Sequence, residues 1–185
     1  MTRYFGLTLL LLWMMMIPAC TCQRTEAVES MYLSEILGPA SGTGLFRGVN
    51  LGDPLSRVLE AEQPRTPAHH DKIGIFYLIP LSGNGSLELE YYADYLRTGR
   101  PSDRVVSIVA NIVLEDEVET ARLYGEILSW CSARYGVPGG VSGDYSWESP
   151  RRLNPDMEVR LRLDSKKGIT LNFIDTQPDT PAEAP

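Results

Sequence analysis

The chain has 185 residues, of which 43% are apolar and 22% are charged, and its formal net charge is −7. This is the composition of an ordinary globular protein, and the length leaves room for one domain once the terminal segments are set aside. The acidic balance repels phosphate backbones and anionic lipid headgroups, so we expect no binding of nucleic acid.

The first nineteen residues have the three-part pattern of a secretory signal peptide. Arg3 precedes an apolar run over residues 5–17, and the small residue Ala19 lies directly before Cys20. The run is shorter than the roughly 20 apolar residues that a membrane-spanning helix needs. We therefore expect residues 1–19 to be removed on export, which leaves 166 residues with a formal charge of −8 because Arg3 is the only charged residue lost.

Residues 17–20, Ile-Pro-Ala-Cys, resemble the lipobox of bacterial lipoproteins, whose cysteine receives diacylglycerol and palmitate. Ala19 and Cys20 fit this motif, whereas Pro18 departs from it, and ordinary signal-peptidase cleavage nearby is the alternative. The resemblance implies that Cys20 is the lipidated first residue of the mature protein. Thr21 in the next position implies sorting to the outer membrane, with the domain facing the periplasm.

Two more cysteines, Cys22 and Cys131, follow the predicted lipidation site. In an oxidising compartment they could form a disulfide. Cys131 falls on the apolar side of a predicted helix, whereas Cys22 lies in a polar tether over residues 20–29. This placement favours a buried free thiol at Cys131.

The first half of the domain predicts two short helices and a hairpin. Apolar residues recur at helical spacing over residues 26–37. A second helix is predicted to begin at Pro54, behind the capping residue Asp53. The pattern then becomes strand-like over residues 73–79 and 87–93, and the turn residues between these segments predict a β-hairpin with one solvated face.

The second half predicts a central strand, a long helix and a second hairpin. Residues 104–115 are largely apolar on both faces, as in a buried strand. Asp116 with Glu119 resembles a capping box, and apolar side chains from Val118 to Tyr135 follow at helical spacing. The segments 157–164 and 169–174 alternate around a short turn and predict the hairpin.

Together these elements predict an α+β fold, in which an antiparallel sheet carries two main helices on one face. No strand–helix–strand alternation demands a parallel sheet. We expect one α+β domain over residues 30–175, after the tether and before a disordered acidic tail over residues 176–185. Within the domain, residues 48–115 and 116–175 could form two units, each a helix followed by strands.

Residues 48–58, Gly-Val-Asn-Leu-Gly-Asp-Pro-Leu-Ser-Arg-Val, resemble the opening motif of the SmpA/OmlA-type small outer-membrane lipoproteins. These belong to the wider set that shares the β-lactamase-inhibitor-protein-like fold. The resemblance implies a short helix before antiparallel strands, in a unit that can be doubled. It also implies protein–protein contacts in the envelope, with no catalysis and no cofactor.

Three polar patterns could carry chemistry, and each has a simpler explanation. The segment 69–71, His-His-Asp, offers metal ligands, but the sequence contains no third histidine, so a solvated loop explains it as well. Glu88, Glu90 and Asp94 form the polar half of an amphipathic strand. Residues 140–144 approach a G-x-S-x-G nucleophile elbow but end in aspartate. We therefore expect that the protein is not an enzyme and that it binds no metal and no cofactor.

Aromatic residues give the strongest indication of a binding surface. Tyr92 and Tyr95 lie on and just past one predicted strand, and Trp147 lies near the strand that follows the long helix. Tyrosine and tryptophan are common at interface hot spots, although burial in the core is the alternative. These three residues are our candidate protein-binding surface.

The hypothesis from the sequence is a non-enzymatic lipoprotein of the cell envelope that binds another envelope protein through its sheet face. The alternative is an inhibitor or immunity lipoprotein that blocks a hydrolase or toxin in the periplasm, because an acidic domain could fit a basic cleft. In either case the membrane is contacted only through the lipid anchor on Cys20.

Overall fold

The computed structural model describes residues 31–39, 43–94, 103–148, 156–165 and 167–176. The predicted signal peptide, the tether and nearly all of the predicted tail lie outside these ranges, as do Cys20, Cys22 and Tyr95. The structural statements below therefore concern the described domain.

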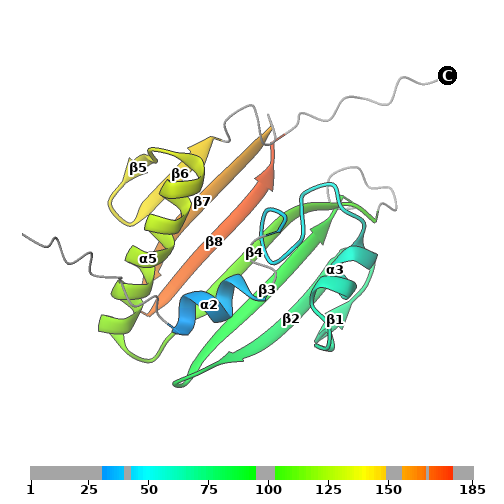
Figure 1. Ribbon diagram of the computed structural model, residues 1–185, viewed down its shortest axis with the longest axis horizontal. Coiled ribbons are helices and arrows are strands. Elements are labelled where there is room, and N and C mark those ends of the chain that lie inside the picture. Colours follow the sequence, from blue (N-terminus) through cyan, green and yellow to red (C-terminus); the bar gives the residue numbers. More distant parts are fainter. Residues whose placement is uncertain (1–30, 40–42, 95–102, 149–155, 166, 177–185) are drawn as a thin grey trace, which may run out of the picture.

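Eight strands form a single antiparallel sheet in the described part of the chain, in the order β1-β2-β3-β4-β8-β7-β6-β5. Their bounds are His69–His70 for β1, Gly74–Leu81 for β2, Gly85–Ala93 for β3, Val105–Val113 for β4, Gly139–Val141 for β5, Asp144–Glu148 for β6, Met157–Ser165 for β7 and Gly168–Asp175 for β8. Strands β4 and β8, which are far apart in the sequence, pair at the centre of the sheet (Figure 1). Strands β1–β4 fall within residues 48–115 and β5–β8 within 116–175.

The helices of the described domain lie on one face of this sheet (Figure 1). They are α2 (Met31–Leu37), α3 (Leu55–Ala61) and α5 (Glu117–Tyr135). Alternate side chains of the long strands point toward the helices and are buried, and many of them are at most 1% exposed. They include Leu87, Leu89, Tyr91, Ile108, Ala110, Ile112, Val159, Leu161, Leu171 and Phe173.

The expected α+β fold with two main helices is wrong. The described residues contain three helices, and the eight-stranded sheet makes up most of their regular structure. The third helix is α2, whose Leu33, Ile36 and Leu37 are buried in the core. The three extra strands β1, β5 and β6 have only two, three and five residues, too few to produce a clear alternation in the sequence.

Local signals account for the longest helix. The Asp116 carboxylate accepts hydrogen bonds from the backbone N–H groups of Val118 and Glu119, so the predicted N-terminal cap is confirmed. The apolar face differs from the one we expected, because Val118 is 75% exposed. The buried side chains are instead Thr120, Leu123, Ile127, Cys131 and Tyr135.

Residues 48–58, which carry the lipoprotein-like motif, form the turn before α3 and most of that helix. Gly48 and Gly52 have φ angles of 82° and 86°, a left-handed conformation that favours glycine. Leu55 and Val58 then bury their side chains in the core. The motif therefore has a structural explanation in the turn and in the helix that follows.

Candidate functional site

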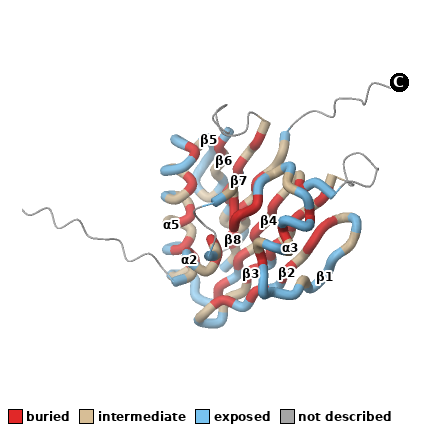
Figure 2. Tube along the Cα trace, turned by 45° about the vertical axis from the view of Figure 1, so that its right-hand side comes forward, coloured by how far each residue is buried: buried red, intermediate tan, exposed pale blue. Residues whose placement is uncertain are grey.

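One face of the sheet carries no helix of the described domain (Figure 1). Successive side chains of a strand point to opposite faces, so the residues between the buried positions point away from the helices. Figure 2 shows this alternation along the strands. We call these residues of the five long strands the open face: Phe76, Leu78 and Pro80; Glu88, Glu90 and Tyr92; Ser107, Val109, Asn111 and Val113; Thr170, Asn172 and Ile174; and Glu158, Arg160 and Arg162.

Aromatic and apolar side chains gather at the β1–β2–β3 end of the open face. The ring centroids of His69 and Phe76 are 5.7 Å apart, and those of Phe76 and Tyr92 are 5.5 Å apart in an edge-to-face arrangement. Leu78 is two residues from Phe76 on the same strand and is 63% exposed. We call Phe76, Leu78 and Tyr92 the apolar patch.

Carboxylates border the apolar patch on the neighbouring strand. Glu90 is paired across the strands with Phe76, and Glu88 with Leu78. The Tyr92 hydroxyl donates a hydrogen bond to the Glu90 carboxylate. Burial of the ring, together with this bond, raises the pKa of Tyr92 to about 12, so the hydroxyl stays protonated.

The arginines at the opposite side of the open face are already paired. Arg160 lies 2.8 Å from Glu158, and Arg162 pairs with Asp164 on the same strand. No cation of the described residues forms an ion pair with Glu88. The apolar patch is therefore flanked by negative charge that is free to meet a cation.

The structure separates the predicted surface residues. Tyr92 lies on the open face. Trp147 does not, because it is 2% exposed in the core and its indole Nε1 donates to the backbone oxygen of Gly136 at 3.0 Å. Phe76 and Leu78 were missed by sequence reasoning, since the segment around them is apolar at nearly every position and its two faces look alike.

The patterns that could suggest catalysis are not brought together. The histidines lie on β1, at one edge of the sheet. Residues 140–144 lie at the opposite edge, on β5, the turn after it and the first residue of β6. His69 Nε2 is 2.9 Å from Asp71 Oδ2, and in the described domain no group of three His, Cys, Asp or Glu side chains could hold a metal ion. Ser142 of the elbow-like pattern and the two histidines therefore lie at opposite edges of the sheet and do not form a pair.

Cys131 is fully buried and its thiol is free, as expected. Burial raises the pKa of this thiol to about 12. Since the thiolate is the reactive form, Cys131 is an unreactive core residue at neutral pH.

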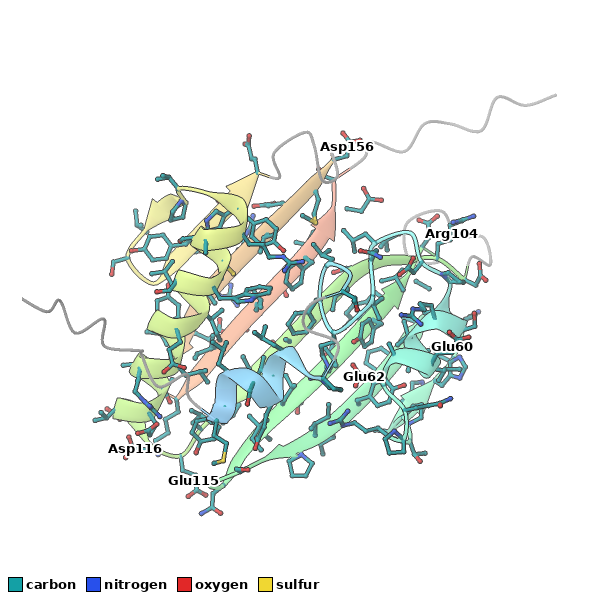
Figure 3. The ribbon with its side chains drawn as sticks, viewed as in Figure 1. Glu60, Glu62, Arg104, Glu115, Asp116 and Asp156 are labelled. Atoms are coloured by element: carbon teal, nitrogen blue, oxygen red, sulfur yellow. The ribbon has the colours of Figure 1, made fainter. Side chains whose placement is uncertain are left out.

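A buried charged cluster lies beneath the helices. Arg47 is bound to Glu62 through two hydrogen bonds, of 2.6 Å from Nε and 2.8 Å from Nη2. Arg47 also donates to the backbone oxygens of Glu35 and Ile36 at the end of α2, and the Tyr91 hydroxyl donates to Glu62 at 2.8 Å. Figure 3 shows Glu62 between α2 and α3. The cluster connects these helices to the sheet.

Glu62 favours the charged form of Arg47 and the protonated form of Tyr91. Burial alone lowers the pKa of Arg47, but the hydrogen bond and charge of Glu62 outweigh it and raise the pKa above its ordinary value. Burial raises the pKa of Tyr91, and the Glu62 carboxylate raises it further. Arg47 and Glu62 are 2% and 0% exposed, so the cluster is closed to a substrate and its role is structural.

Comparison with known proteins gives no assignment: no protein-family model, characterised protein or solved structure matches the chain significantly. In the described domain, no helix is long and apolar enough to cross a membrane.

Proposed function

We propose that this chain is a non-enzymatic, lipid-anchored protein of the bacterial cell envelope that binds another envelope protein through the open face. The observation that carries the proposal is the apolar patch, where the exposed Leu78 lies two residues along β2 from Phe76, whose ring contacts that of Tyr92. Exposed apolar groups of this kind gain free energy when a partner removes them from water. The similarity of residues 48–58 to small outer-membrane lipoproteins also supports this class.

The size of the open face suits a protein partner. Its five long strands have eight or nine residues each. With about 4.8 Å between strands and about 3.3 Å per residue, the flat area of these strands is roughly 500–600 Å². The protruding side chains add further surface to this area. Stable complexes bury about 800 Å² on each partner. We therefore expect the partner to cover most of the face and not the apolar patch alone.

The chemistry of the partner follows from the charges around the apolar patch. We expect the partner to place a protruding apolar side chain against Leu78 and Phe76, and a lysine or arginine near Glu88. The same acidic border would suit the cationic mouth of a hydrolase or toxin. Inhibition or immunity is therefore the second candidate function.

Replacing Leu78 with aspartate should weaken partner binding at least tenfold, which corresponds to about 1.4 kcal/mol, because a carboxylate then has to be buried in the apolar centre of the interface. Capture of the full-length protein from its own envelope identifies the partner, and titration of the purified pair gives the affinity. A structural envelope protein supports the first function, whereas a secreted hydrolase or toxin supports the second.

The matched control is Val118→Asp, which changes an apolar residue that is 75% exposed on the helix side of the domain. This variant should bind the partner as the unmodified chain does. Equal affinity of both variants, or equal loss in both, would contradict binding through the open face.

We propose further that Cys20 carries the lipid that holds the domain at the outer membrane, facing the periplasm. The support is the apolar run over residues 5–17 followed by Ala19 and Cys20. The Cys20→Ser variant should be released as a soluble periplasmic protein, measured by fractionation of the cells. If the variant stays in the membrane fraction, the lipid is not what anchors it.

A further inference from the structure

An apolar line and an acidic line run side by side along one end of the open face. Pro80 is exposed on β2 and continues the line of Phe76 and Leu78, since residues two apart on a strand share a face. We call these three residues the apolar strip, which is about 13 Å long. Glu88 and Glu90 lie beside it on the neighbouring strand β3, opposite Leu78 and Phe76 (Figure 1).

The two carboxylates beside the apolar strip are not neutralised within the described domain. No cation of the described residues forms an ion pair with Glu88 or Glu90, and the hydroxyl that Tyr92 donates to Glu90 is neutral. Arg160 and Arg162 lie on β7, three strands or roughly 14 Å from β3, and have acidic partners there. A ligand that covers the apolar strip therefore needs cations on its β3 side, because an unpaired carboxylate is costly to bury.

The backbone at this edge of the sheet favours a helical ligand over an extended one. β1 pairs only with Ile75 and Phe76. The carbonyl of Phe76 accepts from the N–H of Ala68 on the outer side, so Leu78 and Pro80 direct their backbone groups outward as well. Pro80 has no N–H, and Leu78 is thus the one residue of β2 beyond β1 that can donate to an added strand. A helix satisfies its own backbone hydrogen bonds and gives up nothing here.

We propose that the apolar strip and its two carboxylates bind an amphipathic helix with apolar side chains on one face and lysine or arginine along one flank. The helix belongs to the envelope partner of the proposed function, on which this assignment rests. Alternate residues of a strand are about 6.6 Å apart, close to the distance of about 6 Å between helix residues four apart. Apolar side chains of successive turns therefore meet Phe76, Leu78 and Pro80, while the flanking cations reach Glu88 and Glu90.

Binding of a model helix to the purified full-length chain tests the proposal. The probe is a peptide of about 18 residues, or five turns, made only of leucine and lysine with the leucines along one face. It should bind with a dissociation constant of about 10 μM or tighter and shift the backbone amides of Leu78 and Glu88 saturably. The control peptide has the same composition in strict alternation, which is the period of a strand, and should bind at least tenfold more weakly.

Variants of the chain separate apolar contact from a general attraction to an acidic protein. Leu78→Asn should weaken binding of the model helix at least tenfold, because the polar side chain replaces the apolar one at the centre of the strip. Glu88→Gln combined with Glu90→Gln should weaken it about fivefold and remove most of its salt dependence. Glu60→Gln combined with Glu119→Gln removes the same charge from the exposed helix side and should change the affinity less than about twofold.

The outcomes distinguish the helix from the other occupants of this surface. Equal binding of the alternating peptide, full affinity in Leu78→Asn, or equal losses in the two paired-glutamate variants would overturn the proposal. A dimer of the purified chain that Leu78→Asn abolishes in sedimentation would also overturn it, in favour of a second copy. If the model helix fails to bind while the envelope partner still depends on Leu78, only the helix is wrong. If the partner does not depend on Leu78, the proposed function itself fails.

Discussion

Replacing Arg47 with methionine should lower the free energy of unfolding by about 3–5 kcal/mol. The change leaves the Glu62 carboxylate buried without its guanidinium, and it removes the donors that hold the last carbonyl groups of α2. The Tyr91 hydroxyl and the half-exposed Arg65 still reach Glu62, but neither replaces the two-point contact. Chemical denaturation of the variant and the unmodified chain measures the difference.

The matched control for this prediction is Arg57→Met. Arg57 also pairs with a glutamate, Glu60 at 3.3 Å, but both side chains are exposed, so the loss should be within about 0.5 kcal/mol. Glu62→Gln should lower the free energy of unfolding less when Arg47→Met is already present than it does in the unmodified chain. In the Arg47→Met background, Glu62→Gln removes a buried charge that has already lost its partner. Equal losses for Arg47→Met and Arg57→Met would show that the buried pair does not form.

Replacing Trp147 with alanine should lower the free energy of unfolding by about 3–5 kcal/mol, as expected for a large side chain removed from a packed core. The ring is 2% exposed, and its hydrogen bond to Gly136 ties β6 to the end of α5. Trp147→Phe keeps most of the apolar volume and loses the hydrogen bond, so its loss should be about 1–2 kcal/mol. Thermal or chemical denaturation measures both.

The same variants decide whether Trp147 belongs to the core or to a binding surface. If the residue were a surface anchor, Trp147→Ala would leave stability nearly unchanged and reduce partner binding. The core position predicts the reverse: the folded fraction of Trp147→Phe should bind the partner with unchanged affinity. A stability loss below about 1 kcal/mol for Trp147→Ala would contradict burial.

The elements that could be predicted from the sequence are those with strong local signals. The cap at Asp116 and the glycine at residue 136 bound α5. The turn between β2 and β3 places Gly83 and Asn84 at φ angles of 71° and 67°, the left-handed conformation that glycine and asparagine tolerate best. Alternation of apolar and polar residues then defines β3, β7 and β8 on either side of such turns.

What could not be predicted depends on contacts between distant segments. Arg47 and Glu62 are 15 residues apart in irregular segments, and nothing near either of them in the sequence indicates a buried pair. The direction of Trp147 depends on the pairing of β6 with β7, where it lies opposite the buried Val159.

Only part of the candidate surface could be predicted from the sequence, because the direction of some side chains depends on how distant segments pack. On β3, apolar residues such as Leu89 and Tyr91 alternate with more polar ones, and the apolar set is buried. Tyr92 falls in the other set, so the sequence pattern alone predicts that it points away from the core. Phe76 and Leu78 lie on β2, where both faces are apolar, and only the sheet shows which one the helices cover. Tyr95, the third tyrosine of this region, lies outside the described residues.

The measurement that tests the central claim most directly is site-specific photo-crosslinking in living cells. A photoreactive phenylalanine analogue placed at Leu78 on the open face, and separately at Val118 on the helix side, reports which surface a partner touches. Binding through the open face predicts a discrete adduct with one envelope protein from position 78 and none from position 118. An adduct from position 118 alone, or from neither position, would contradict it.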